Sequence, residues 1–262
     1  MRKLGISIGG ETVEGVQRII DLAKNAGFTA CFSGGNTKDI MRQNSELVCK
    51  SGLEVDNLHA PFNGINAMWE DNEAGADIYA RLKDDIDVCA EFGIKKTVFH
   101  ISSGWTPPKM NDLGFARYDF LVDYAAGKGV SIAFENLRMP GNLSALMERY
   151  EHAENVGFCW DAGHELCYTP RWEYMPLFGH RAICIHLHDN IAVRTGDLHM
   201  LPFDGKRDWN HAAQLIKNSA YTGPIMLEAG YDPRFYADLT TEEYYARAYA
   251  AAVKIRDLMG EE

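Results

Sequence analysis

The stretch Ile183-Cys184-Ile185-His186-Leu187-His188-Asp189-Asn190, followed shortly by Asp197-Leu198-His199, decides the fold of this 262-residue chain. An apolar run typical of a β-strand ends abruptly in imidazole and carboxylate side chains. In an α/β barrel the catalytic groups lie at the carboxyl ends of the strands. We therefore expect other strands of this chain to end in side chains of the same kinds.

Strand-like and helix-like segments alternate along the whole chain. Strands are expected at Leu4–Ile8, Phe28–Phe32, Leu53–Leu58, Lys96–Phe99, Val130–Phe134, Val156–Trp160, Ala182–Ile185 and Ile225–Leu227. Helices are expected at Thr12–Ala26, 36–52, Glu73–Phe92, Leu113–Ala126, Ser144–His152, Trp172–Phe178, Trp209–Ala220 and from Thr240, where Thr240 and Glu243 have the spacing of a capping box. Such alternation requires parallel strands joined by right-handed crossovers.

These repeats predict an α/β fold, a single (β/α)8 TIM barrel domain spanning residues 1–262, because no linker or change of composition divides them. A doubly wound open sheet is the alternative, and it usually carries a glycine-rich phosphate loop after its first strand. Ile8-Gly9-Gly10-Glu11-Thr12 does not have the spacing of that loop. The barrel is therefore the preferred prediction.

The composition indicates the cellular compartment of the protein and the kinds of partner that it binds. The net charge of −11 does not suit binding to a phosphate backbone through bulk charge. Six cysteines without a C-x-x-C pair suggest free thiols in a reducing compartment. The chain has no signal peptide pattern and no apolar run long enough for a membrane span. We expect a cytoplasmic protein with a small-molecule partner rather than a membrane or nucleic acid, with homo-oligomerisation left open.

Six consecutive strands, the third to the eighth, end in residues that can bind a metal ion: His59, His100, Glu135, Asp161, His186 and Glu228. Any one of them alone is more often a loop residue or a satisfied core histidine. Their shared position at one mouth of a barrel predicts that they converge, since a buried charge without a partner is costly. Carboxylates mixed with imidazoles suit Mn²⁺, Zn²⁺, Co²⁺ or Mg²⁺ without choosing among them.

Further residues are candidates for a second metal ion or for substrate binding. His164, Asp197 and His199 follow the sixth and seventh strands. Trp105 lies in a loop expected at the mouth and could stack on a sugar, although packing explains a tryptophan equally well. The acidic run from Asp84 to Asp87 is expected to be a solvated helix face.

The ordered set from His59 to Glu228 resembles the xylose-isomerase-like TIM barrel superfamily, which joins sugar isomerases and epimerases to endonuclease-IV-type nucleases. Three motifs resemble its sugar phosphate isomerase/epimerase group: Asp161-Ala-Gly-His164, His186-Leu-His-Asp-Asn190 and the Asp-x-His-x-x-Pro-x-x-Gly run from Asp197 to Gly205. The resemblance implies that one divalent ion is bound by Glu135, Asp161, His186 and Glu228.

The same resemblance implies a reaction, namely metal-assisted proton transfer next to the carbonyl of a sugar, sugar phosphate or keto-polyol. Glu135 and Glu228 would take and return the proton. The expected substrate-binding residues are His59, His164, Trp105 and Arg194. The chain departs from the ketose 3-epimerases, which have a second substrate-binding Glu where Gly141 stands here and an Arg that Arg194 matches only approximately. The resemblance therefore implies a related isomerase, epimerase or keto-inositol-type dehydratase.

Two other functions remain open at this point. The nucleases of the superfamily cleave abasic-site DNA with up to three ions, and His59, His100, His164, Asp197 and His199 match their further ligands. Their Glu-Asn-Thr-Ala-Gly run is replaced by Glu135-Asn-Leu-Arg-Met139, which favours the isomerase branch. A polyol-binding barrel without turnover is the third reading.

Overall fold

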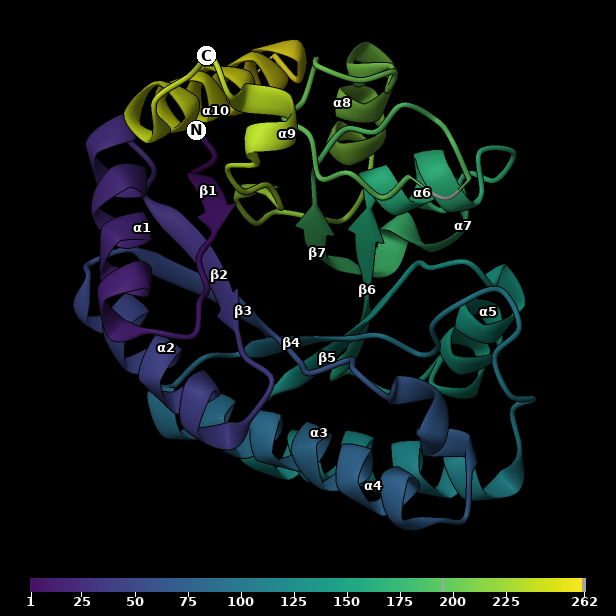
Figure 1. The fold of residues 1–262 in the computed structure, drawn as a ribbon. Coiled ribbons are helices and arrows are strands. Elements are labelled where there is room, and N and C mark those ends of the chain that lie inside the picture. Colours follow the sequence, from purple (N-terminus) through teal and green to yellow (C-terminus); the bar gives the residue numbers. More distant parts are fainter. Residues whose placement is uncertain (195, 261–262) are drawn as a thin grey trace.

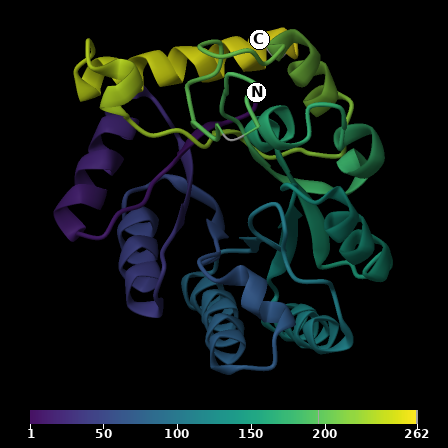
Figure 2. The ribbon, with the colours of Figure 1, turned by 45° about the vertical axis from the view of Figure 1, so that its right-hand side comes forward.

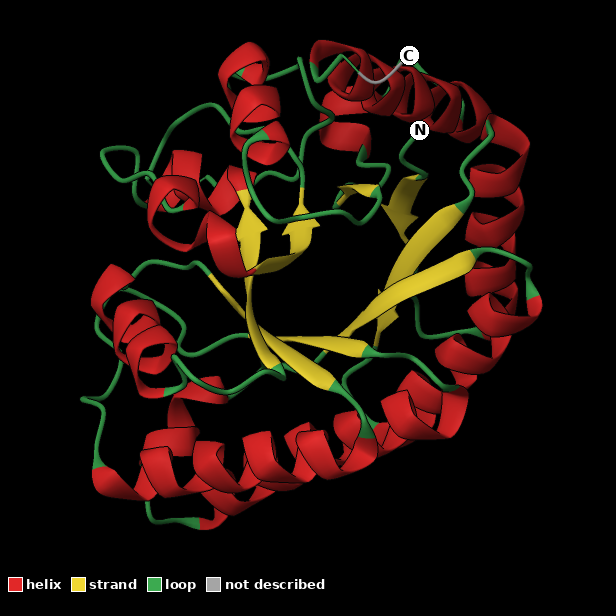
Figure 3. Ribbon diagram, turned by 180° about the vertical axis from the view of Figure 1, so that it is seen from behind, coloured by secondary structure: helices red, strands yellow, loops and turns green. Residues whose placement is uncertain are grey.

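Parallel strands line the centre of the molecule and helices surround them in the computed structural model, which describes residues 1–194 and 196–260 (Figure 1, Figure 3). The strands are β1 (Leu4–Ser7), β2 (Ala30–Gly34), β3 (Glu54–His59), β4 (Lys96–Phe99), β5 (Ser131–Glu135), β6 (Val156–Asp161), β7 (Ala182–His186) and β8 (Ile225–Leu227). They form one 8-stranded sheet in the order β7-β6-β5-β4-β3-β2-β1-β8. This sequential order confirms the barrel and excludes the doubly wound sheet.

The barrel closes between its two end strands. Leu187, directly after β7, forms an isolated parallel bridge with Leu227 of β8. The Leu187 amide donates to the Met226 carbonyl at 3.0 Å, and the Glu228 amide donates to the Leu187 carbonyl at 3.0 Å. The seam between β7 and β8 is thus joined directly beside two of the predicted metal ligands.

The helices form the outer layer, which the turned view in Figure 2 shows around the strands. They are α1 (Val13–Ala26), α2 (Lys38–Lys50), α3 (Glu73–Phe92), α4 (Asp112–Lys128), α5 (Pro140–Arg149), α6 (Ala162–Tyr168), α7 (Met175–Phe178), α8 (Trp209–Lys217), α9 (Pro233–Tyr236) and α10 (Thr241–Leu258), with 3₁₀ turns η1 (Ile65–Trp69) and η2 (Gly179–Arg181). The predicted capping box of Thr240 and Glu243 begins α10. The sequence did not predict α6, α9 or the 3₁₀ turns.

Burial places two polar-capable side chains in the core. Trp69 is 2% exposed and donates to the Ile101 carbonyl at 3.3 Å, so it packs in the core. The expectation of a solvated acidic face on α3 was wrong for Asp85, which is fully buried and accepts a hydrogen bond from Thr97 at 2.5 Å. Among the described residues, no helix is both long and apolar enough to cross a membrane.

Candidate metal centre

Four predicted ligands come together at the carboxyl ends of β5 to β8. One ligand atom from each of Glu135, Asp161, His186 and Glu228 lies within 4.8 Å of the others. His186 Nδ1 lies 3.0 Å from Glu135 Oε1 and 3.3 Å from Glu228 Oε2. Glu135, Asp161 and His186 are buried, whereas the Glu228 side chain is 17% exposed. The two glutamates therefore approach the same imidazole nitrogen, and Glu228 is the more exposed of the two.

The electrostatics of this cluster fit a cation. Burial raises the pKa of the Glu135 carboxyl, but His100 and His186 outweigh it and hold that pKa well below its usual range. For Glu228, burial is likewise outweighed by His186, so its pKa is also lowered well below normal. Burial lowers the pKa of His186, yet its anionic neighbours raise it well above the ordinary value. A divalent ion would replace the proton of this imidazole, so metal binding releases protons.

Buried polar atoms at the centre lack hydrogen bonds within the described part of the chain. They include Glu228 Oε2, His164 Nδ1 and Asp197 Oδ1. Buried polar atoms without partners are rare and call for an explanation such as an ion. Carboxylates and imidazoles at these separations are a donor set suited to a divalent transition metal or Mg²⁺, so the residues fit the predicted ion.

A second donor group adjoins the first one. His164, His188, Asp197 and His199 each offer an atom within 4.8 Å of the others. His164 Nε2 donates to Asp197 Oδ2 at 3.1 Å, and His199 Nε2 lies 3.4 Å from the same oxygen. The sequence analysis identified three of these residues as candidates for a second site. His188 is the addition, and its place two residues after His186 on a strand extension was the signal for it.

His59 and His100 approach the centre from β3 and β4. Their Nε2 atoms lie 3.4 Å and 2.8 Å from Glu135 Oε2. His59, Glu135 and His186 form a third donor group. Burial lowers the pKa of both histidines, but Glu135 and Glu228 raise that of His59 above normal, whereas that of His100 stays lowered. All nine predicted metal or second-site residues therefore lie around one mouth of the barrel.

Neighbouring backbone and amide groups orient the ligands. The Asn136 side chain accepts from the Asp161 amide at 2.8 Å and donates to the Asp161 carbonyl at 2.8 Å, which ties the end of β5 to the end of β6. Asp161 also caps α6, because its Oδ1 accepts from the His164 amide at 2.5 Å. His188 Nε2 lies 3.1 Å from Asp161 Oδ2. Such contacts fix the rotamer of a ligating side chain.

The long segment between β7 and α8 carries Asp197 and His199, and Asp189 shapes it. Asp189 is fully buried and accepts hydrogen bonds from several donors, namely the amides of Asn190, Phe203 and Arg207 and the Trp209 indole. His199 has a positive φ of 45° and donates from Nδ1 to the Glu228 carbonyl at 3.0 Å. This contact leaves its Nε2 facing Asp197, as a metal ligand requires.

A cavity of about 270 Å³ opens above the ligands. Its lining includes His59, His100, His164, Asp197, His199 and Glu228, together with Phe62, Arg138 and Tyr168, which the sequence analysis did not select as site residues. Tyr168 donates to Asp197 Oδ2 at 3.0 Å, and Arg138 donates to the Tyr168 hydroxyl at 2.5 Å. A hydroxyl bridging an arginine and a ligand carboxylate connects the cavity wall to the second donor group.

The two remaining predicted substrate contacts lie at the rim. The guanidinium of Arg194 stacks 3.9 Å from the Trp105 ring, whose edge meets Tyr168 at a centroid distance of 5.8 Å. Of the described residues, those that line the cavity do not include Trp105 or Arg194. The stack therefore lies behind the Arg138–Tyr168 wall, and direct contact with a substrate stays a prediction.

The family model and the solved structures that this chain resembles indicate the same kind of barrel. A family model described as "Xylose isomerase-like TIM barrel" matches residues 20–253. An uncharacterized protein, y4fM, of Sinorhizobium fredii is 27% identical over 94% of this chain and 90% of its own length. The structure of a D-tagatose 3-epimerase-like protein matches with a TM-score of 0.77 and 18% identity over 99% of this chain and 98% of that one. The IOLI protein with a bound zinc atom matches with a TM-score of 0.71 and 18% identity over 99% and 98%.

Proposed function

The chain belongs to the xylose isomerase-like TIM barrel family, and from that premise we propose that it is a divalent-metal-dependent isomerase or epimerase of a sugar, sugar phosphate or keto-polyol. One observation carries the proposal: Glu135 Oε1 and Glu228 Oε2, from the ends of β5 and β8, both lie close to His186 Nδ1, at 3.0 Å and 3.3 Å. Their lowered pKa values keep both carboxylates ionised, and an ionised carboxylate beside a substrate carbon can accept its proton. The similarity to an epimerase-like protein and to a zinc-binding barrel supports the assignment.

Glu135, Asp161, His186 and Glu228 would hold the ion. When bound, a divalent cation supplies a Lewis acid that polarises the carbonyl and its adjacent hydroxyl. Glu228, the more exposed of the two glutamates, is the proposed base, since a substrate in the cavity reaches it directly. Glu135, on the buried side, would pass a proton to the substrate from His59, whose Nε2 lies 3.4 Å from Glu135 Oε2.

Histidines would orient the substrate oxygens. Burial lowers the pKa of His164, but Asp161 and Asp197 raise it to about 10, so this imidazole enters the site as a hydrogen-bond donor. His59 donates from Nδ1 to the Ala60 carbonyl at 3.0 Å, which points its Nε2 toward the centre. His100 packs against the Phe62 ring at a centroid distance of 4.5 Å and borders the entrance.

The test is solvent deuterium exchange at the carbon next to the carbonyl, measured with a panel of ketoses, aldoses and keto-inositols. Glu228→Gln keeps the shape of the side chain and removes the base, so exchange should fall by about 10²-fold or more. Glu148→Gln on the exposed side of α5 is the matched control and should exchange as the wild type does. Wild-type exchange in Glu228→Gln would refute the role of Glu228.

A second candidate is metal-dependent cleavage of a phosphodiester in abasic-site DNA. The specific observation in its favour is the presence of three donor groups, which can hold more than one ion. The net charge of −11 weighs against a polyanionic substrate, and so does the cavity, in which Arg138 is the one arginine among the described lining residues. Cleavage of an abasic duplex, followed on a gel, discriminates between the two candidates.

A further inference from the structure

A second cavity adjoins the metal pocket on the side of β1 to β3. It measures about 350 Å³ and shares His59 and Phe62 with the pocket above the ligands. Sites for small molecules usually measure ~300–1,000 Å³. The metal pocket alone, at about 270 Å³, lies at the lower limit of that range. The two adjoining cavities offer room for a substrate longer than a single sugar ring.

The walls of this second cavity are built by two glycine pairs at the carboxyl ends of β1 and β2. Gly9-Gly10 and Gly34-Gly35 line it. Asn44, which is 1% exposed on α2, donates to the carbonyl of Gly10 at 3.1 Å and to that of Gly34 at 2.8 Å. One buried amide thus holds both loops in place. A Cβ added at Gly9 would have no atom within 4 Å, so the backbone there borders open space.

Asn36 offers the polar side chain that a ligand in this cavity can reach, since it lines the cavity and is exposed. Ser33 lines the cavity too, but the residue is 1% exposed and its Oγ is buried, so it is not a ligand contact. A ligand hydroxyl would bond to the Asn36 amide, which can both donate and accept.

The junction of the two cavities is aromatic. Phe62 lines both of them and is 43% exposed, although its ring already stacks on His100 with an interplanar angle of 25°. An exposed aromatic face beside hydroxyl-binding groups is suited to the apolar face of a sugar ring.

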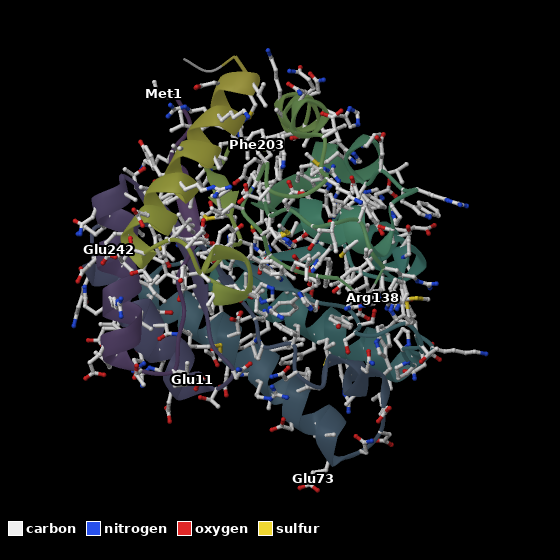
Figure 4. All side chains as sticks on the ribbon, turned by 45° about the horizontal axis from the view of Figure 1, so that its top comes forward. Met1, Glu11, Glu73, Arg138, Phe203 and Glu242 are labelled. Carbon is white, nitrogen blue, oxygen red and sulfur yellow. The ribbon has the colours of Figure 1, made fainter. Side chains whose placement is uncertain are left out.

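The two cavities at the mouth of the barrel differ in the charged side chains that line them. Apart from His59 at the junction, the charged side chain lining the second cavity is Glu11, and no lysine or arginine of the described residues joins it. Arg138 lines the metal pocket instead, and Figure 4 shows Glu11 and Arg138 on opposite sides of the view. A phosphate on the β1–β3 side would meet a carboxylate without a compensating cation.

We propose that the β1–β3 cavity binds the second sugar ring of an uncharged glycosyl-ketose, whose carbonyl-bearing ring lies over the metal ligands. This substrate class rests on the proposed function and deepens it. Asn36 and the Gly9 and Gly34 loops form the wall against the second ring, and Phe62 contacts both rings.

The test compares binding to the full chain loaded with Mn²⁺, measured by calorimetry with D-fructose, fructose 6-phosphate, maltulose and isomaltulose. At least one of the two disaccharides should bind about tenfold or more tightly than fructose, and the phosphate should give no such gain. Gly9→Leu fills the cavity, and its backbone is outside the left-handed region, so it should fold and lose the disaccharide preference. Gly127→Leu, on the exposed side of α4 with no atom within 4 Å of its Cβ, should keep that preference.

A second variant guards against a folding defect in the first. Asn36→Ala should weaken disaccharide binding and leave fructose binding unchanged, because Asn36 lines the β1–β3 cavity and not the metal pocket. Equal affinity for fructose and both disaccharides, tighter binding of the phosphate, or an unaltered preference in a folded Gly9→Leu would overturn the inference. Deuterium exchange is read separately, so a disaccharide preference without exchange rejects the proposed reaction, and exchange without a preference rejects only the second-ring site.

Discussion

The orientation of a proposed metal ligand, Asp161, depends on a glycine. A Cβ on Gly163 would lie 2.0 Å from Cε1 of His188, whose Nε2 is 3.1 Å from Asp161. Gly163→Ala should displace the His188 imidazole, because the rigid ring cannot bend around the added methyl group. The Asp161 carboxylate would then lose its contact with His188. We expect stability to fall by ~1–3 kcal/mol. Mn²⁺ affinity should fall by about 10–100-fold, since groups that orient ligands typically contribute that much.

Calorimetric titration with Mn²⁺ and thermal melting of the chelated protein measure these two effects. Gly127→Ala in α4 is the matched control, because a Cβ there meets no atom within 4 Å. It should be neutral or stabilising by up to about 1 kcal/mol, as alanine is the better helix former. Unchanged Mn²⁺ affinity in Gly163→Ala would show that His188 does not orient Asp161.

Asp85 gives the stability of the protein a pH dependence. Burial raises the pKa of this carboxyl to about 7, and the hydrogen bond from Thr97 only partly offsets it. Because the folded pKa exceeds the unfolded one, the contribution of Asp85 is fully present below about pH 4 and is lost as pH rises to about 7. Asp85→Asn should therefore stabilise the protein at pH 8 by a few kcal/mol relative to its effect at pH 4.

Urea unfolding at pH 4 and pH 8 measures this difference. Asp87, two residues along α3, is the control of opposite sign. Burial raises its pKa, but Tyr124 and Lys83 outweigh it and lower it to about 2. Asp87→Asn should therefore destabilise the protein at pH 8. An Asp85→Asn variant whose stability relative to the wild type is the same at both pH values would contradict the assignment.

At the scale of secondary-structure elements, the spacing of apolar residues predicted most of the helices and strands that position the site. The polar residues at the strand ends predicted where the site lies. The helix at Glu73–Phe92 and the strand at Lys96–Phe99 have the predicted bounds. The strand-end residues converge as expected because parallel strands of a barrel all end at one mouth. Asp85 could also have been recognised as buried, since it shares a helix face with Leu82 and Cys89, three and four residues away.

Local patterns could not predict the parts of the site that depend on tertiary contacts. Helix α6 has seven residues and follows its N-cap, Asp161, which is a proposed ligand. No apolar periodicity in the sequence indicates this short helix or the capping role of Asp161. The place of Asp197 depends on the hydrogen bonds of Asp189 to amides 14 and 18 residues away in sequence. The glycine pairs at the β1–β3 cavity become a wall through Asn44, and residue spacing does not reveal that contact.

At the scale of the whole molecule, the ion would join the two ends of the sheet. β7 and β8 are the terminal strands in the sheet order and meet at the bridge between Leu187 and Leu227. His186 precedes one side of that bridge and Glu228 follows the other, and both belong to the four-residue donor group. An ion that binds both residues cross-links the seam, and any ligand specific to the folded state also stabilises it by mass action.

Removal of the ion should therefore destabilise the seam between β7 and β8 more than the other strand pairs of the barrel. Chelation with EDTA should lower the melting temperature and speed hydrogen exchange at the amides of Leu187 and Glu228, which bond across the seam. Exchange in the β2–β3 pair, whose register runs from Ala30–Glu54 to Gly34–His59, should change far less. Exchange mass spectrometry with and without Mn²⁺ resolves the two regions. A uniform change over all strands would indicate general stabilisation, whereas protection restored by Mn²⁺ at the seam alone would identify the ion as the link that closes the sheet.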